Sequence, residues 1–290
     1  MLGRLTDIER PARAGLFFLR EVLYNHGKGA ETMDDFERAW RKQLAAEKKY
    51  IDERSRRSDS RLNRFLQTKV SEKLKDTLDT GFAKAFELIF AKGTGVIEKT
   101  YNRRDIERSS RVRRIIAENN PTGRALNEAS RGSASQKLKN TVASGVSGIG
   151  MGLIGVGIPD IPVFTGMLLK SLYETALGYG YDYDRMDEKY FILLLIGAAL
   201  RSGDELKAAD ERVNYFIEHG AEPDEETMKT EVKIAADGLS GELLYMKFLQ
   251  GIPIVGAVGG AYDPIYIDRI TRYASMKYNR RFLHDIKNKH

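Results

Sequence analysis

Apolar residues recur at three- and four-residue steps along most of the chain. The clearest stripe crosses residues 62–90: Leu62, Phe65, Leu66, Val70, Leu74, Leu78, Phe82, Phe86, Ile89 and Phe90. This spacing is typical of an amphipathic α-helix, because 3.6 residues complete one turn. We expect Gly93, Thr94 and Gly95 to end this helix. A long polar helix that contains Trp40 is predicted before it, over residues 32–57.

The same pattern predicts five helices in the second half of the chain, over residues 160–179, 186–200, 204–219, 224–250 and 264–285. Asp160, Asp204 and Asp224 stand where a side-chain oxygen would accept a free backbone N–H of the first turn. The strict alternation of apolar and polar residues that marks a half-buried strand is missing. The sequence therefore predicts an all-α fold, a multi-helix bundle.

Two apolar segments are rich in glycine, around residues 140–159 and 251–261. A glycine inside a helix costs about 1 kcal/mol relative to alanine, so this many glycines indicate a packing or binding reason. Small residues three and four positions apart let two helix backbones approach closely. We expect the two segments to pack together. The candidate contact residues are Gly148, Gly152, Gly155, Gly256 and Gly259.

The first of these segments also matches the dinucleotide-binding pattern G-x-G-x-x-G at Gly150, Gly152 and Gly155. That pattern needs a strand before it and an unbroken helix after it. Residues 136–140 are too polar for a buried strand, and Pro159 and Pro162 interrupt the helix that the pattern requires. We therefore predict no cofactor.

Composition excludes several kinds of chemistry. The chain has no cysteine, so disulfides, zinc–thiolate sites and cysteine nucleophiles are ruled out. The four histidines are scattered, and no metal site and no catalytic set is predicted. With 42% hydrophobic residues, the 290-residue chain can bury a sizeable core.

Positive charge is concentrated in the first half. Residues 1–140 hold 31 basic and 20 acidic side chains, whereas residues 141–290 hold 16 and 21. The densest basic run supplies Arg103, Arg104, Arg108, Arg111, Arg113 and Arg114. Such a patch suits the phosphate groups of lipid or nucleic acid. The alternative is a solvated helix face whose arginines pair with acids of the same chain.

No leader and no transmembrane helix is expected. Charged residues interrupt the apolar positions of residues 1–24, and no segment offers about 20 strongly apolar residues in a row. The nearest approach, residues 140–159, consists largely of small residues. We therefore expect a protein of the cytoplasm, peripheral at the inner face of the membrane.

A series of short motifs carries a resemblance to a known family. In order they are Pro159–Pro162, Tyr179–Asp182, Phe191–Leu193, Arg201–Glu205, Ile252–Ala261 and Arg280–Leu283. This series resembles the EcsC protein family, most strongly over residues 140–285. We therefore predict a basic, amphipathic N-terminal part (residues 1–130) and an EcsC-like helical core (residues 131–290). The motifs make Asp160, Pro162, Tyr181 and Asp182 candidate binding residues.

The resemblance implies partners rather than a reaction. The namesake gene cluster also encodes the ATPase and membrane subunits of an ABC transporter. The leading hypothesis is therefore a non-enzymatic protein that binds membrane lipid or membrane transporter subunits. A second hypothesis is a hydrolase or lipid-modifying enzyme with a site around Asp160, which has an N-cap role as its alternative. A third, nucleic-acid binding through the arginine run, is the least favoured because recognition motifs are missing.

Overall fold

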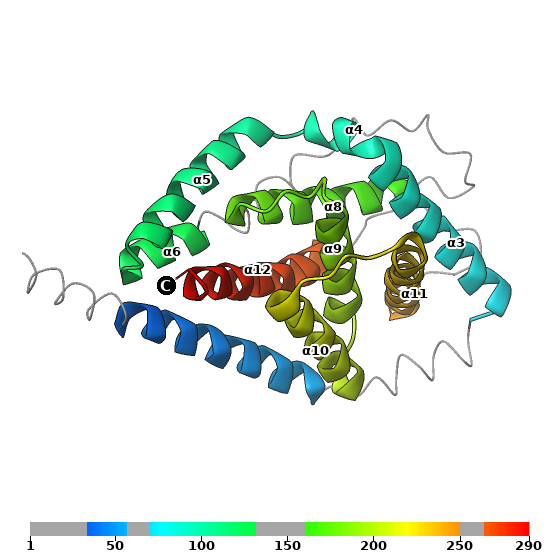
Figure 1. Cartoon of the computed structure of the whole chain (residues 1–290). Coiled ribbons are helices and arrows are strands. Elements are labelled where there is room, and N and C mark those ends of the chain that lie inside the picture. Colours follow the sequence, from blue (N-terminus) through cyan, green and yellow to red (C-terminus); the bar gives the residue numbers. More distant parts are fainter. Residues whose placement is uncertain (1–33, 57–69, 132–159, 250–263, 290) are drawn as a thin grey trace, which may run out of the picture.

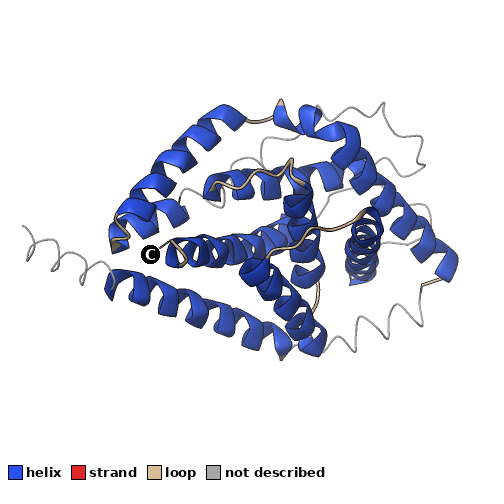
Figure 2. Cartoon of the chain, in the orientation of Figure 1, coloured by secondary structure: helices blue, strands red, loops and turns tan. Residues whose placement is uncertain are grey.

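The computed structural model describes residues 34–56, 70–131, 160–249 and 264–289, and within these ranges the fold is all-α (Figure 2). A first helix covers residues 34–55. It is followed by α3 (Glu72–Leu88), a π-helical turn η1 (Ile89–Gly93), α4 (Thr94–Glu98), α5 (Arg103–Asn119), α6 (Gly123–Arg131), α8 (Asp160–Tyr179), α9 (Met186–Ala199), α10 (Gly203–His219), α11 (Glu225–Leu249) and α12 (Pro264–Lys287).

The bundle is organised around α9. Every residue from Phe191 to Ala199 is buried, so this part of the helix has no solvent face. That follows from its sequence, which is apolar on all sides after the first turn. Helices α10, α11 and α12 pack directly on α9, and α8 packs along α12. Figure 1 shows α9 in the middle of these helices.

The outer helices pack on this centre. Helix α3 lies against α11 and α8, while α5 lies against α8 and α6. The helix at 34–55 lies along α12, where Gln43 donates a hydrogen bond to the Met276 carbonyl at 2.8 Å. In Figure 1, α5 follows the periphery of the molecule. One apolar core joins side chains from Phe36 to Ile286, on both sides of the predicted domain boundary, and the boundary itself stays a prediction.

The helix predicted over residues 62–90 differs from the structure at both ends: Ser71 is the N-cap residue of α3, which begins at Glu72, and the predicted stop at Gly93–Gly95 is wrong. The chain continues through η1 into α4 and leaves the helix only after Glu98. At the end of α3 the backbone N–H of Ile89 still donates to the carbonyls of Ala85 and Phe86, and the chain then passes into the π-helical turn η1 instead of leaving the helix. Lys189 of α9 donates to the Phe90 carbonyl in this turn at 3.3 Å. A π turn of this kind keeps the backbone hydrogen-bonded as a helix. The glycines of the sequence do not reveal such a turn.

The helix starts test the predicted caps. Asp224 caps α11, because its carboxylate accepts from the Thr227 N–H at 2.8 Å. The prediction for Asp204 is wrong: Ser202 is the N-cap residue, and Asp204 lies in the first turn and pairs with Lys207 at 2.8 Å. Asp160 is the first residue of α8, but its side chain lies outside the described part.

Candidate functional site

The end of α8 is held by a glycine in a left-handed conformation. Gly180 has φ +84°, which a residue with a Cβ adopts only with strain. Its N–H donates to the Leu177 carbonyl, and the N–H of Tyr181 donates to the Ala176 carbonyl, each at 2.9 Å. These two bonds form a Schellman motif. It turns the chain sharply and fixes where Tyr181 and Asp182 project.

The loop after Gly180 sends its tyrosines inward. The Tyr181 hydroxyl donates to Asp285 of α12 at 2.9 Å. The Tyr183 hydroxyl donates to Glu98 of α4 at 2.6 Å, and its ring stacks on Tyr173 with centroids 4.1 Å apart. The loop is thus fastened to α8, which precedes it, and to α4 and α12, which are distant in the sequence.

The aspartates of the loop point to one arginine. Arg103 of α5 donates to Asp182 at 3.1 Å and to Asp184 at 2.7 Å. The same guanidinium contacts Glu98 at 2.7 Å and Glu107 at 2.6 Å. Burial alone would lower the pKa of Arg103, but these carboxylates raise it above its ordinary value. Arg103 is therefore a cation that joins α4, α5 and the loop.

Arg114, three turns further along α5, is also committed to the fold. Its guanidinium pairs with Glu118 at 2.8 Å and with Asp285 at 2.6 Å. It also donates to the Tyr179 carbonyl at the end of α8. Arg113 of the same helix donates to the Gly178 carbonyl at 3.4 Å. The inward arginines of α5 thus anchor the helix to α8 and α12.

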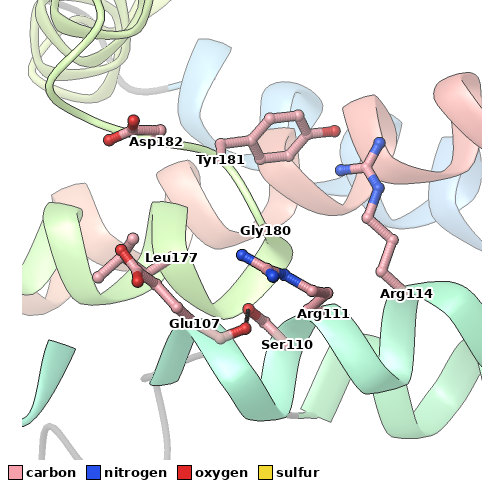
Figure 3. A pocket seen from close by; sticks show the side chains of 8 residues that line it. All are labelled: Glu107, Ser110, Arg111, Arg114, Leu177, Gly180, Tyr181 and Asp182. Carbon is pink, nitrogen blue, oxygen red and sulfur yellow. Dashed lines mark hydrogen bonds between the residues drawn. The ribbon is translucent and has the colours of Figure 1, made fainter. Parts of the chain in front are cut away.

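A cleft of about 370 Å³ lies between α5 and this loop (Figure 3). Helix α5 supplies Glu107, Ser110, Arg111 and Arg114, while the other wall consists of Leu177, Gly180, Tyr181 and Asp182. Figure 3 shows Arg111 and Glu107, one turn apart on α5, reaching toward the wall at Gly180 and Leu177. Among the described residues, Arg111 has no hydrogen-bond or ion-pair partner. It is the uncommitted cation of the cleft.

The tyrosines near the cleft serve as hydrogen-bond donors. Burial and the neighbouring Asp285 raise the pKa of Tyr181 well above its ordinary value of 10.0. Burial and the hydrogen bond to Glu98 raise the pKa of Tyr183 in the same way. Both hydroxyls therefore keep their protons at neutral pH and donate them to carboxylates of the fold.

The outward face of α5 has a different character. Arg104, Arg108 and Arg111 are exposed on it, and the next turns expose Val112, Ile115 and Ile116 to about half of their surface. Among the described carboxylates Arg108 approaches only that of Asp105, at 3.9 Å, and both side chains are largely exposed. We call these six residues the outer face of α5.

Some of the predicted site residues lie together in the structure, and others fall outside its described part. It brings Tyr181, Asp182, Arg111 and Arg114 together at one cleft, although the sequence predicts the first two separately from the arginine run. Pro162 lies half-buried in the first turn of α8. The glycine candidates Gly148, Gly152, Gly155, Gly256 and Gly259 lie outside the described residues. The enzymatic hypothesis around Asp160 likewise stays a prediction.

Two clusters of buried charged side chains were not predicted from the sequence. Glu188, at the start of α9, pairs with Arg281 of α12 at 2.6 Å and accepts from the Tyr278 hydroxyl. Burial raises the pKa of Glu188 above its ordinary value, against the opposing effects of Arg281 and Tyr278. Lys277 is fully buried and pairs with Glu47 and Asp210. A lysine on the otherwise apolar face of α12, four residues after Tyr273, was the available signal.

Within the described residues, no helix is long and apolar enough to cross a bilayer, and no three metal-binding side chains gather at one point.

Fold and cleft together define an all-α bundle with a polar surface cleft of mixed charge. The particular family is given by comparison with known proteins. The chain belongs to the EcsC protein family, whose model matches residues 35–283. No match was found among curated proteins or among solved structures.

Proposed function

We propose that this protein is a peripheral membrane protein that binds anionic lipid through the outer face of α5. The observation that carries the proposal is the composition of that face: three exposed arginines lie beside three exposed β-branched apolar residues on one helix. Stable peripheral attachment needs two signals of this kind, a basic patch and an apolar insertion.

The apolar part supports the proposal because it is concentrated. Six large apolar side chains are exposed in the described part of the chain, and three of them, Val112, Ile115 and Ile116, lie within five residues of α5. Single exposed apolar residues are ordinary on protein surfaces, whereas a contiguous group marks an interaction site. Transfer of this group into the headgroup region would contribute about 25 cal/mol per Å² of apolar surface removed from water.

The basic part supports it because the arginines are not used by the fold. Arg104 and Arg111 have no ion-pair partner among the described residues, and Arg108 has only its distant contact with Asp105. Each such cation gains about 1 kcal/mol near an anionic membrane surface. The inward arginines of the same helix, Arg103 and Arg114, are held in ion pairs and contribute to folding instead.

The test is liposome co-sedimentation of the full chain. The liposomes contain phosphatidylcholine alone, or phosphatidylcholine with about 30% phosphatidylglycerol, at low salt and at about 0.5 M salt. We expect binding that requires the anionic lipid and weakens with salt. Arg104→Gln with Arg108→Gln should reduce binding severalfold, and so should Val112→Thr, Ile115→Thr and Ile116→Thr together.

Matched control variants test whether binding depends on the outer face of α5 or on exposed charged and apolar residues in general. Lys42→Gln with Lys48→Gln removes the same charge from exposed positions of the 34–55 helix. Tyr215→Thr removes the most exposed large apolar residue, which is on α10. Both controls should bind as the unaltered chain does. Equal losses in the controls, or binding to native membranes but never to protein-free liposomes, would contradict the lipid proposal; the latter would favour a membrane protein such as a transporter subunit.

A further inference from the structure

The cleft between α5 and the Gly180–Asp182 loop carries both signs of charge in equal number. Its lining holds the cations Arg111 and Arg114 and the carboxylates Glu107 and Asp182. A site without net charge, but with separated positive and negative groups, matches a ligand of the same kind. A simple anion would meet two carboxylates, and a simple cation would meet two guanidinium groups.

The cleft side chains whose hydrogen-bonding atoms are not all used within the fold narrow the choice of ligand. Arg111 has all its donors free of partners in the described structure, whereas Arg114 is held by Glu118 and Asp285. Arg111 therefore suits a phosphate, which a guanidinium binds with two parallel N–H groups. Glu107 uses one carboxylate oxygen for Arg103, and Asp182 uses one for Arg103 and the Asp184 N–H. Their second oxygens can accept from an ammonium group.

The aromatic residues of the cleft indicate whether the ammonium group of the ligand is primary or quaternary. A quaternary ammonium has no N–H to donate and is usually bound by open aromatic faces. The aromatic ring in the described lining is that of Tyr181, and the guanidinium groups of Arg281 and Arg114 already lie 4.1 and 5.2 Å from its centre. Carboxylate oxygens are available and an open ring is not. The cleft is therefore suited to a primary ammonium.

Size and position agree with this ligand. A volume of about 370 Å³ is at the small end of ligand sites. Arg111 belongs both to the cleft and to the outer face of α5, so the cleft opens beside the surface that we propose to meet the membrane. A headgroup at that surface could enter the cleft while its acyl chains stay in the bilayer.

We infer that this cleft binds an aminoalkyl phosphate, the headgroup of phosphatidylethanolamine, with the phosphate on Arg111 and the primary ammonium on Glu107 and Asp182. The inference rests on the proposed membrane-binding function for the source of the headgroup. The chemistry of the cleft is the same for a free phosphoethanolamine, so the experiment has one arm without membranes and one with them.

In the first arm the full chain is titrated with O-phosphoethanolamine, phosphocholine and inorganic phosphate by calorimetry. We expect phosphoethanolamine to bind at least about tenfold more tightly than the other two, since each lacks one charged hydrogen bond. Arg111→Gln and Glu107→Gln should each remove about tenfold of that affinity. Arg104→Gln with Arg108→Gln should leave it unchanged. Thermal melts confirm that each variant is folded, and Arg111→Gln removes no hydrogen bond or ion pair between described residues.

In the second arm, liposomes with a fixed share of anionic lipid contain either phosphatidylcholine or phosphatidylethanolamine. We expect tighter binding to the phosphatidylethanolamine liposomes, and loss of that preference in Arg111→Gln. Equal affinity for phosphoethanolamine and phosphocholine, or no effect of Arg111→Gln, would overturn the inference while anionic-lipid binding could still stand. Phosphoethanolamine binding without any liposome binding would support the cleft and overturn the membrane function.

Discussion

Helices α5 and α12 are both rich in basic residues, yet the structure uses them in opposite ways. On α12, Lys277 is fully buried between Glu47 and Asp210, and Arg281 is largely buried against Glu188. On α5, the outward arginines are exposed, and within the part of the chain that the structure describes their one ion pair is the 3.9 Å contact of Arg108 with Asp105. Basic runs in a sequence therefore do not indicate one role, because the role depends on which side of the helix meets the core.

The difference has an energetic cause. A buried charge is tolerated only when it is paired and hydrogen-bonded, so the buried cations Lys277 and Arg281 of α12 each meet one or more carboxylates. An exposed ion pair contributes little to stability, so the outward arginines of α5 can be retained without any role in folding. This leaves the outward arginines of α5 available for a ligand, whereas Lys277 and Arg281 of α12 are held inside the fold.

The largest expected effect comes from breaking the buried cluster on α12. Lys277→Met keeps most of the unbranched side chain but leaves the carboxylates of Glu47 and Asp210 without the cation they share. We expect a loss of about 3–5 kcal/mol in the free energy of unfolding, measured by urea denaturation. The control is Arg272→Gln on the same helix, whose pair with Asp268 is exposed. A loss below about 1 kcal/mol is expected there, and equal losses would disprove the distinction.

A smaller effect should separate two adjacent arginines of α5. Arg103→Gln leaves four carboxylates near one another without their common cation, namely Glu98, Glu107, Asp182 and Asp184. We expect a loss of about 1.5–3 kcal/mol, since hydrogen bonds to charged groups contribute in this range. Arg104→Gln, one residue further and exposed, should change stability by no more than about 0.5 kcal/mol. Chemical denaturation of both variants measures the difference. Similar losses of stability would contradict the distinction between the ion-paired Arg103 and the exposed Arg104.

Much of the fold could be predicted from the periodicity of apolar residues. The predicted ends of the helices in the second half fall within two residues of the observed ends, because breakers and caps such as Gly180, Gly220 and Asp224 lie at them. The prediction failed at Gly93, where local glycine chemistry favours an end. In the structure the chain stays helical past Gly93, and α3 and α4, which lie on either side of that residue, both contact α8.

The site could be predicted only in part. The family motif singles out the Gly180–Asp182 step, and the density of arginine singles out the basic run. Their meeting at one cleft was not predictable, because Arg103 and its partners Asp182 and Asp184 are about eighty residues apart in the chain. Nor does the sequence show which arginines face inward. Neighbours such as Arg103 and Arg104 differ by about 100° around the helix, and only the packing of α8 on α5 decides between them.

The smallest effect concerns the pH dependence of the inward side of α5. Glu118 pairs with Arg114 and with Lys289 at 2.8 Å each. Burial would raise the pKa of Glu118, but hydrogen bonds from Lys289 and Arg114 lower it below its ordinary value of 4.5. The folded state thus binds the proton more weakly than the unfolded chain does. The resulting stability is complete above about pH 4.5 and is lost as the pH falls through the folded-state pKa.

Glu118→Gln should therefore destabilise the protein by about 1 kcal/mol at pH 7. The difference from the unaltered chain should shrink as the pH is lowered below 4.5, because the carboxyl of the unaltered chain then becomes neutral as well. Urea denaturation between about pH 7 and pH 3 measures this. Glu128→Gln on α6, whose pair with Arg124 is exposed, should show a smaller difference at pH 7 and little change with pH. A Glu118→Gln deficit that persists undiminished at the lowest pH would show that packing of this side chain, and not its charge, secures α5 to the bundle.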